Sequence, residues 1–373
     1  MSTNQSAAER SPSQRLLSLD FFRGLTMLLL VGEGALVYDA MVSEPYAGTW
    51  IAQFGSHFHH HPWHGLRFWD LVQPFFMFIV GVAMPFSFAR RLQRGDRWVA
   101  CLGHVLKRSA ILLALGVTIY IYAAERIVFQ YWNVLAQLAF TYTVAFLLMR
   151  FQWRIQLAAS LALIAITELL YRYAGIAGFD QPFVPDRNFG TYMDFVLMGV
   201  GTFEGGHWVV FNAVPTAAHT IWGVLAGQLL MSARSDTYKI AVLAAAGAAG
   251  LAIGFSLDLV TPIIKRIATS SFVFASGGWA LLGLALCYWI IDSKGCKRHT
   301  TFAVVVGMNS LFAFLFINLG GSAFFRGIIA PFTNTLFAWA GSGTQLLITS
   351  LAVWFAIWAL CYWMYRRRIF INI

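Results

Sequence analysis

The sequence predicts an all-α fold, a polytopic integral membrane bundle of about ten transmembrane helices. Of its 373 residues, 59% are hydrophobic and 11% are charged, whereas about 25% are charged in an ordinary soluble domain. Roughly 220 apolar residues could fill about ten spans of about 20 residues each. The composition therefore excludes a soluble enzyme, a disulfide scaffold and a disordered chain.

Continuous apolar segments give the positions of ten predicted spans. They are approximately residues 16–38, 67–88, 105–124, 129–150, 155–174, 215–232, 238–258, 272–292, 301–319 and 344–365. The segment 320–343 is also apolar but contains Pro331 and several glycines, so we expect it to be re-entrant or interfacial rather than an eleventh span. Residues 1–14 are predicted to be a disordered cytoplasmic N-terminus, and residues 15–373 to form a single transmembrane domain.

The distribution of Lys and Arg predicts the orientation of the bundle, because loops that stay in the cytoplasm carry an excess of both. If the N-terminus lies inside, 19 of the 26 Lys and Arg residues lie inside as well. The other seven lie outside: Arg67, Arg126, Arg172, Arg187, Lys265, Arg266 and Arg326. This asymmetry predicts that both termini are cytoplasmic. The expected partner of the positive clusters is therefore the lipid bilayer, with no nucleic acid.

Ionisable side chains inside predicted spans are costly, so the few that occur are candidates for function. Asp20 and Arg23 lie three residues apart and can pair on one helix face. The pair is either structural, or it leaves Arg23 facing an anionic ligand on the inner side. Glu33 has no partner visible in the sequence, so it is a candidate for lining a polar cavity. Other polar residues in or at the ends of predicted spans are Glu168, His219, Asp258 and Asn309.

The densest group of chemically versatile side chains is residues 57–70, HFHHHPWHGLRFWD. Four of its histidines recur at steps of three or four residues: His57, His60, His61 and His64. A helix would put them on one face, as a metal site would need, but Pro62 argues against a continuous helix. No Cys or Asp completes a closed site, so no metal is expected. The alternatives are a pH-sensitive loop and a single catalytic histidine, whose ordinary pKa suits proton transfer near neutrality.

Several segments together resemble the heparan-alpha-glucosaminide N-acetyltransferase family and its bacterial relatives. The first is RLLSLDFFRGLTMLLLV (15–31), and the second is HHPWHGLRFWDLVQPFFMFIVGVAMPFSFARRLQRG (60–95). The segments that follow in the family's order are NVLAQLAFTY (133–142), IWGVLAGQLL (221–230), GMNSLF (307–312) and YRRRIFINI (365–373). The resemblance extends over nearly the whole chain, and the ordered set is more specific than any one segment.

The resemblance implies a transmembrane acyltransferase that passes an acetyl group from cytoplasmic acetyl-CoA to a sugar amine on the far side. The family's active histidine lies three residues before the Trp of a His-x-x-Trp-x-Gly step, which corresponds to His60. The family's Asp before Leu-Val corresponds to Asp70, and the Asn of its GMNS step to Asn309. An Asn near the end of the family's matching first helix falls near Glu33 or Gly34.

On this basis His60 and Asp70 are the predicted catalytic residues, with His60 as general base or transient acyl carrier. Glu33, His64 and Asn309 are the predicted acceptor-binding residues. Acetyl-CoA is the expected co-substrate. Its phosphates are predicted to bind six inside residues that would otherwise serve only as membrane anchors: Arg23, Arg90, Arg91, Arg94, Lys107 and Arg108.

Three functions stay open on sequence grounds. The first is an acetyltransferase acting on an amino or hydroxyl group of a sugar or glycan at the outer side. The second is a transporter of a small polar or anionic solute, with Glu33, Asp70 and Arg23 on its path. The third is a histidine-rich metal or pH sensor. The luminal domain and extra first span of the lysosomal family member have no counterpart here, so the expected location is a bacterial inner membrane. A homodimer is one expected assembly.

Overall fold

The computed structural model describes residues 16–199 and 206–371, and within them every regular element is a helix. The predicted disordered segment 1–14 lies outside the described residues. The N-terminal elements are α1 (Leu17–Gly34), α2 (Val37–Met41), η1 (Glu44–Tyr46), α3 (Trp50–Ser56), η2 (Phe68–Leu71) and α4 (Val72–Gln93). The central elements are α5 (Trp98–Ala124), α6 (Val134–Met149), α7 (Trp153–Tyr173), α8 (Phe189–Met198), η3 (Val210–Asn212), α9 (Ala213–Met231) and α10 (Asp236–Leu257). The C-terminal elements are α11 (Ser270–Cys287), η4 (Tyr288–Ser293), α12 (Thr301–Met308), α13 (Ser310–Asn318), α14 (Gly321–Leu336), η5 (Ala338–Ala340) and α15 (Ser342–Arg366).

These elements form a multi-pass helical membrane bundle. Within the described residues, six helical segments are long and apolar enough to cross a membrane. They are Phe68–Gln93, Trp98–Ala124, Trp153–Tyr173, Asp236–Leu257, Ser270–Ser293 and Ser342–Arg366. Helices α12 and α13 add a seventh if they are one span, although they are bent by 71° at Asn309. The number ten and the cytoplasmic placement of both termini stay predictions.

The first predicted span, 16–38, is interrupted in the structure. Helix α1 ends at Gly34, and Leu36 then adopts the left-handed conformation, with φ of 59°, before α2 begins at Val37. Helix α1 also carries three charged residues, Asp20, Arg23 and Glu33, which a plain lipid-facing span would avoid. Its polar groups therefore need a polar space within the bundle.

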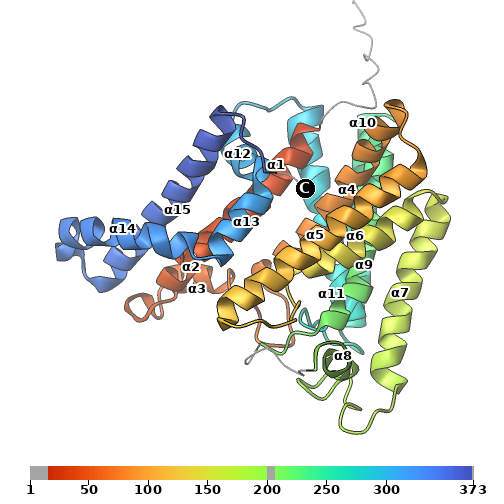
Figure 1. Cartoon of the computed structure of the whole chain (residues 1–373), viewed down its shortest axis with the longest axis horizontal. Helices are drawn as coiled ribbons and strands as arrows, with labels where there is room; N and C mark the ends of the chain where they lie inside the picture. Colours follow the sequence, from red (N-terminus) through yellow and green to blue (C-terminus); the bar gives the residue numbers. More distant parts are fainter. Residues whose placement is uncertain (1–15, 200–205, 372–373) are drawn as a thin grey trace, which may run out of the picture.

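The segment 320–343 contains α14, which is helical through Pro331. Its exposed apolar side chains recur every four residues and form one stripe: Phe324, Ile328, Phe332 and Leu336. Figure 1 shows α14 extending away from the rest of the bundle beside α15. An apolar stripe on a protruding helix is typical of an interfacial segment, which favours the interfacial alternative for this region.

The helices form two groups that share α1 (Figure 1). One buried cluster joins α1 to α4, α9 and α11, and a second joins α1 to α13 and α15. Helices α4 and α9 approach very closely at Gly81 and Gly223. A Cβ atom on Gly81 would lie 2.1 Å from the carbonyl oxygen of Thr220, so this contact requires glycine, as close helix contacts in membranes often do. The contact fixes α4, which carries residues at both ends of the candidate site.

Candidate functional site

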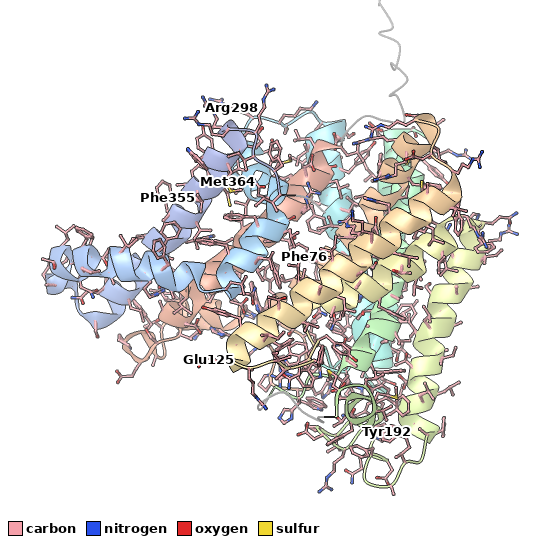
Figure 2. The ribbon with its side chains drawn as sticks, in the orientation of Figure 1. Phe76, Glu125, Tyr192, Arg298, Phe355 and Met364 are labelled. Atoms are coloured by element: carbon pink, nitrogen blue, oxygen red, sulfur yellow. The ribbon has the colours of Figure 1, made fainter. Side chains whose placement is uncertain are left out.

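A cavity of ≈ 770 Å³ lies among α1, α4, α5, α6 and the bend between α12 and α13. Figure 2 places Phe76, one of its lining residues, in the space between α5 and α13. The cavity has two polar ends. We call them the basic end, at Arg23, Arg90 and Arg108, and the histidine end, at His60 and Lys265.

The basic end receives one arginine from each of three helices: Arg23 from α1, Arg90 from α4 and Arg108 from α5. Arg23 pairs with Asp20 at 2.7 Å, which confirms the predicted i, i+3 contact, while both residues also line the cavity. The guanidinium of Arg108 stacks over the Tyr142 ring at 4.7 Å from its centroid. The basic end thus combines three cations with one lining carboxylate, an excess of positive charge that suits an anionic ligand.

Three of the six predicted phosphate-binding residues do not line this cavity. Arg91 is paired with Asp96 at 3.4 Å. Arg94 and Lys107 are exposed on the outer surface of the bundle. The predicted set therefore divides into three residues that could contact a ligand in the cavity and three that face elsewhere.

The two ends of the cavity are separated by the length of a membrane-spanning helix. Asp20 and Glu33 both line the cavity and are 13 residues apart on α1, a rise of about 20 Å. From Asp70 to Arg90, η2 and α4 span about 30 Å, which matches the hydrocarbon thickness of a bilayer. A long, thin ligand bound at the basic end could therefore extend to the histidine end.

At the histidine end, Asp70 is oriented by the backbone of the loop that precedes it. Its Oδ2 accepts hydrogen bonds from the backbone N–H of Arg67 at 2.9 Å and of His61 at 3.3 Å. Its Oδ1 then faces Nδ1 of His60 at 3.0 Å. No helix runs through residues 57–67, as Pro62 predicts, so the histidines do not share one helix face. The loop instead brings one of them, His60, against Asp70.

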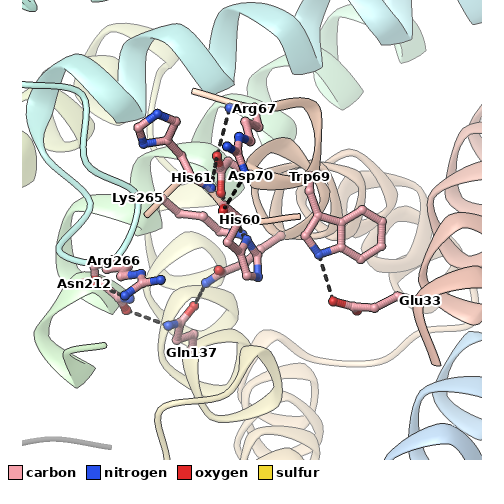
Figure 3. Close-up of polar contacts among 11 residues, drawn as sticks. Glu33, His60, His61, Arg67, Trp69, Asp70, Gln137, Asn212, Lys265 and Arg266 are labelled. Atoms are coloured by element: carbon pink, nitrogen blue, oxygen red, sulfur yellow. Dashed lines mark hydrogen bonds and ion pairs between the residues drawn. The ribbon is translucent and has the colours of Figure 1, made fainter. Parts of the chain in front are cut away.

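Lys265, from the loop between α10 and α11, completes this group (Figure 3). Its Nζ lies 3.0 Å from Nδ1 of His60 and 3.8 Å from Oδ1 of Asp70. The side chains of Lys265 and Asp70 are 7% and 1% exposed, whereas His60 keeps 33% of its side chain exposed. The Trp208 ring packs edge-on against His60 at 5.3 Å and lies 5.4 Å from Nζ of Lys265. The lysine is therefore enclosed, and the histidine retains access to the cavity.

This environment keeps His60 neutral at physiological pH. Burial, and secondly the Lys265 ammonium, lower the pKa of His60 from 6.5 to about 4, although Asp70 opposes the change. Burial lowers the pKa of Lys265 from 10.5 to about 8, although Asp70 and Glu33 oppose the change. A neutral imidazole with an accessible edge can act as a base or a nucleophile.

A chain of side-chain amides extends from the cavity wall to the loop that carries Lys265 (Figure 3). Gln73 donates to Gln137, Gln137 donates to Oδ1 of Asn212 at 2.6 Å, and Asn212 donates to the carbonyl of Arg266 at 3.3 Å. Gln137 and Asn212 are both 1% exposed. Buried amides need these partners, so the chain ties α4 and α6 to the residue next to Lys265.

Glu33 has a partner that its sequence position did not reveal. The indole N–H of Trp69 donates to its carboxylate at 2.9 Å, and both residues line the cavity near His60. The prediction that Glu33 lines a polar cavity is therefore consistent with its position. Its role in acceptor binding stays a prediction.

The other two predicted acceptor-binding residues lie elsewhere. His64 is on the surface, where its Nε2 lies 2.9 Å from Asp258 and its side chain is 54% exposed. Asn309 is fully buried at the bend between α12 and α13. Its amide donates to the carbonyl of Ile369 at 3.0 Å and accepts from the N–H of Ile371 at 3.1 Å. Ile371 lines the cavity, so Asn309 shapes the cavity wall through the C-terminal segment.

Glu168, a further predicted candidate, holds the loop of Lys265 in place. Its Oε1 accepts from Arg172 at 2.7 Å and from Thr261 at 2.7 Å, and its Oε2 accepts from Ser270 at 2.9 Å. Asp258 caps the same loop by accepting from the N–H of Ile263 at 2.7 Å. These carboxylates thus position the loop at both its ends.

Sequence reasoning missed Lys265 and Trp208. Lys265 is more than 200 positions from His60, so no local pattern connects the two. One signal existed, because Lys265 and Arg266 are adjacent cations among the seven Lys and Arg residues predicted to lie outside. Two neighbouring cations on the side that normally lacks them point to a specific use. For metals, no three His, Cys, Asp or Glu side chains within residues 16–199 and 206–371 are grouped to hold an ion.

Helices α1, α4, α5 and α6 of the cavity wall, and the loop that carries His60, fall within a known family pattern. The model of DUF5009, described as a domain of unknown function, matches residues 15–232. The chain belongs to the DUF5009 family. The match includes His60, Asp70 and all three cavity-lining arginines, but it ends before Lys265 and Asn309. The predicted correspondences at 307–312 and 365–373 therefore stay predictions.

Two curated proteins are similar to part of this DUF5009 chain. Heparan-alpha-glucosaminide N-acetyltransferase of Mus musculus is 35% identical over 115 residues, which is 31% of this chain and 15% of the relative. The Homo sapiens protein of the same name is 34% identical over 105 residues, 28% of this chain and 14% of the relative. The similarity thus supports the resemblance to this family, over about a seventh of the relatives' length.

Proposed function

We propose that this protein is a membrane-embedded acetyltransferase that uses acetyl-CoA and acetylates an amino or hydroxyl group of a sugar or glycan. The observation that carries the proposal is the continuous cavity, in which three arginines line one end and the His60–Asp70 pair lies at the other. The partial similarity to two N-acetyltransferases supports the same reaction class. The acetyl donor would enter from the cytoplasm and the acceptor from the outer face of a bacterial inner membrane.

Each end of the cavity has a role in this proposal. Arg23, Arg90 and Arg108 bind the phosphates of CoA through charge-assisted hydrogen bonds. The pantetheine arm extends along α1 and α4 toward His60, and the acceptor binds near Glu33. Water is limited there by Trp69 and Trp208, which protects the thioester from hydrolysis.

His60 can promote transfer by either of two balanced routes. As general base, its Nε2 takes the proton of the acceptor while the acceptor attacks the thioester carbonyl. The C–S bond breaks, and the thiolate leaves with the proton that His60 carried. As acyl carrier, Nε2 attacks the carbonyl, the C–S bond breaks and the thiolate leaves. The acceptor then attacks the acetyl carbonyl, the bond between the acetyl group and Nε2 breaks, and the acceptor's proton goes to the thiolate. In both routes Asp70 holds the ring through Nδ1.

Radiolabelled acetyl-CoA tests the proposal directly. Purified protein is incubated with the labelled donor, alone and with a panel of amino sugars, beside His60→Ala and the matched histidine control His104→Ala from α5. We expect wild type and His104→Ala to transfer label, and His60→Ala to lose roughly 10²–10⁴-fold of the rate. Acid-labile label on the protein before acceptor is added would select the acyl-carrier route.

The same preparation addresses the transporter alternative, in which Glu33, Asp70 and Arg23 lie on a solute path. Reconstituted vesicles are assayed for uptake of labelled amino sugars with and without acetyl-CoA. Solute movement that needs no acetyl-CoA, together with no transfer to any sugar, would overturn the acetyltransferase proposal. Full transfer activity in folded His60→Ala would overturn the role of His60.

A further inference from the structure

Nδ1 of His60 has two competing partners, and it can serve only one at a time. Asp70 Oδ1 and Lys265 Nζ each lie 3.0 Å from this atom. A carboxylate requires Nδ1 to carry a proton and donate it, whereas an ammonium requires Nδ1 to be unprotonated and accept. The two contacts therefore belong to two different tautomers of a neutral ring.

The two tautomers differ in the reactivity of Nε2, the ring nitrogen that faces the cavity. When Nδ1–H donates to Asp70, Nε2 carries a lone pair and can act as base or nucleophile. When Lys265 donates to Nδ1, Nε2 carries the hydrogen and can do neither. No hydrogen bond to Nε2 occurs among residues 16–199 and 206–371, and His60 lines the cavity. The competition at Nδ1 thus decides the reactivity of the edge that faces substrate.

We propose that Lys265 is a positioning residue that competes with Asp70 for Nδ1 of His60 and thereby sets which ring nitrogen is reactive. The inference rests on the proposed function for the identity of the reacting group. While Lys265 is protonated and bonded to Nδ1, the unreactive tautomer is favoured. When Lys265 loses its proton to solvent, Nδ1 carries the ring hydrogen and donates it in a hydrogen bond to Asp70. The ring hydrogen moves from Nε2 to Nδ1 through water, with no net change in the protonation of His60.

Few other charged or titratable groups near His60 and Lys265 could compete for Nδ1. The guanidinium of Arg67 donates to the backbone carbonyl of His60 at 3.3 Å, and its backbone N–H donates to Asp70. Glu33, from α1, is a more distant acidic group whose charge acts on Lys265. Arg266 also opposes protonation of His60, but its guanidinium lies against the Trp208 ring at 5.7 Å. His61, on the same loop, donates its backbone N–H to Asp70. From α6, the neutral Gln137 bonds to other amides.

The pKa values fit such a device. With a pKa of about 8, Lys265 changes its proton occupancy just above neutrality, where His60 with a pKa of about 4 is already neutral. A rise in His60 reactivity near pH 8 therefore reports a change of tautomer and not loss of charge from the ring. A residue with a merely structural role would give no such step.

Modification by diethyl pyrocarbonate measures this without any acceptor. The reagent attacks unprotonated imidazole nitrogens, and fragment-ion mass spectrometry assigns the modification rate to each histidine between pH 5 and pH 9. The proteins compared are wild type, Lys265→Met, Lys265→Arg and the matched neighbour control Arg266→Gln. His104, on α5, is the internal control and should react equally in all four proteins.

We expect wild type and Arg266→Gln to show a step in His60 reactivity near pH 8. Lys265→Met should lack the step, because no ammonium competes at any pH. It should also raise the pKa of His60, since a like charge is removed. The reactivity of this variant at pH 5 should therefore fall below its own level at neutral pH, by about tenfold for each pH unit by which the raised pKa exceeds 5. Lys265→Arg should lack the step and stay slow throughout, because arginine keeps its charge.

A wild-type profile in folded Lys265→Met, or an equal change in Arg266→Gln, would overturn the inference. Folding is checked by size-exclusion elution and circular dichroism. Acetyl transfer by the same four proteins forms a separate arm. A step near pH 8 with no transfer to any acceptor would contradict the proposed function and leave the inference standing. Acetyl transfer by a wild-type protein that shows no step in His60 reactivity near pH 8 would support the proposed function and overturn the inference.

Discussion

At the basic end of the cavity each cation comes from a different helix, whereas at the histidine end the polar groups come from two loops and the short helix η2 and contact one another. Arg23, Arg90 and Arg108 reach the same space from α1, α4 and α5. His60, from the loop before η2, Asp70, from η2, and Lys265, from the loop between α10 and α11, meet within 3.8 Å.

This difference teaches how each end should respond to substitution. Separate side chains on rigid helices contribute independently, so their effects should add. Groups that share one hydrogen-bonding atom are coupled, so removing one changes the others. If the proposed function holds, substitutions at the basic end should therefore weaken donor binding independently, while those at the histidine end should act as one unit.

The largest expected effect is at the histidine end, with Asp70→Asn. The amide has one acceptor oxygen, which would take the backbone N–H groups that Oδ2 now accepts, so its NH2 group would face Nδ1 and favour the unprotonated atom. The buried Lys265 also loses its nearest negative charge, and His60 loses its reactive tautomer. We expect acetyl transfer to fall roughly 10²–10⁴-fold, with the Kd for acetyl-CoA nearly unchanged. Radiolabel transfer and isothermal calorimetry measure the two quantities.

The matched control for Asp70→Asn is Asp96→Asn, which alters a partly exposed carboxylate that pairs with Arg91 outside the cavity. It should retain most of the transfer rate. An equal loss in both variants, or a loss of acetyl-CoA binding in Asp70→Asn, would break the distinction between the two ends.

The basic end was the easier part to predict. Short basic clusters beside apolar segments are visible in one dimension, and the structure brings Arg23, Arg90 and Arg108 to one cavity. Lys107 faces away from the cavity because of how α5 is rotated about its axis, and Arg94 because the chain leaves α4 there. Apolar segments with weak periodicity determine neither.

The histidine end was predictable only where its contacts are local. His60 and Asp70 are ten residues apart and their pairing fits the family resemblance. Lys265 and Trp208 reach His60 through the packing of α9 and α11 against α4, over separations that no sequence period encodes. The break at Leu36 was also missed, because a left-handed leucine has no signal of the kind that glycine provides.

An intermediate effect is expected at the basic end, with Arg90→Gln and Arg108→Gln. Each removes one charge-assisted contact to phosphate, worth about 1.4 kcal/mol, so the Kd for acetyl-CoA should rise about tenfold. The double variant should show about a hundredfold rise, because the two arginines act independently. The rate at saturating donor should change little.

Calorimetry at two salt concentrations checks this prediction, since the arginine contribution should weaken as salt is added. Arg94→Gln and Lys107→Gln are the matched controls, because both residues are exposed outside the cavity. Equal losses in these controls would mean that the general positive charge of this face, and not the cavity, attracts the donor.

The smallest expected effect is that of His64→Ala, a histidine only four residues from His60. Its ring pairs with Asp258 at the surface with 54% exposure, and exposed pairs contribute at most about 1 kcal/mol to the free energy of unfolding. Asp258→Asn should cost more, because Asp258 also accepts from the backbone of Ile263. Thermal unfolding followed by tryptophan fluorescence measures both, and the double variant should resemble Asp258→Asn alone. If His64→Ala instead abolished transfer in folded protein, the acceptor site would extend from His60 to the surface loop, and the histidine end would be larger than the cavity.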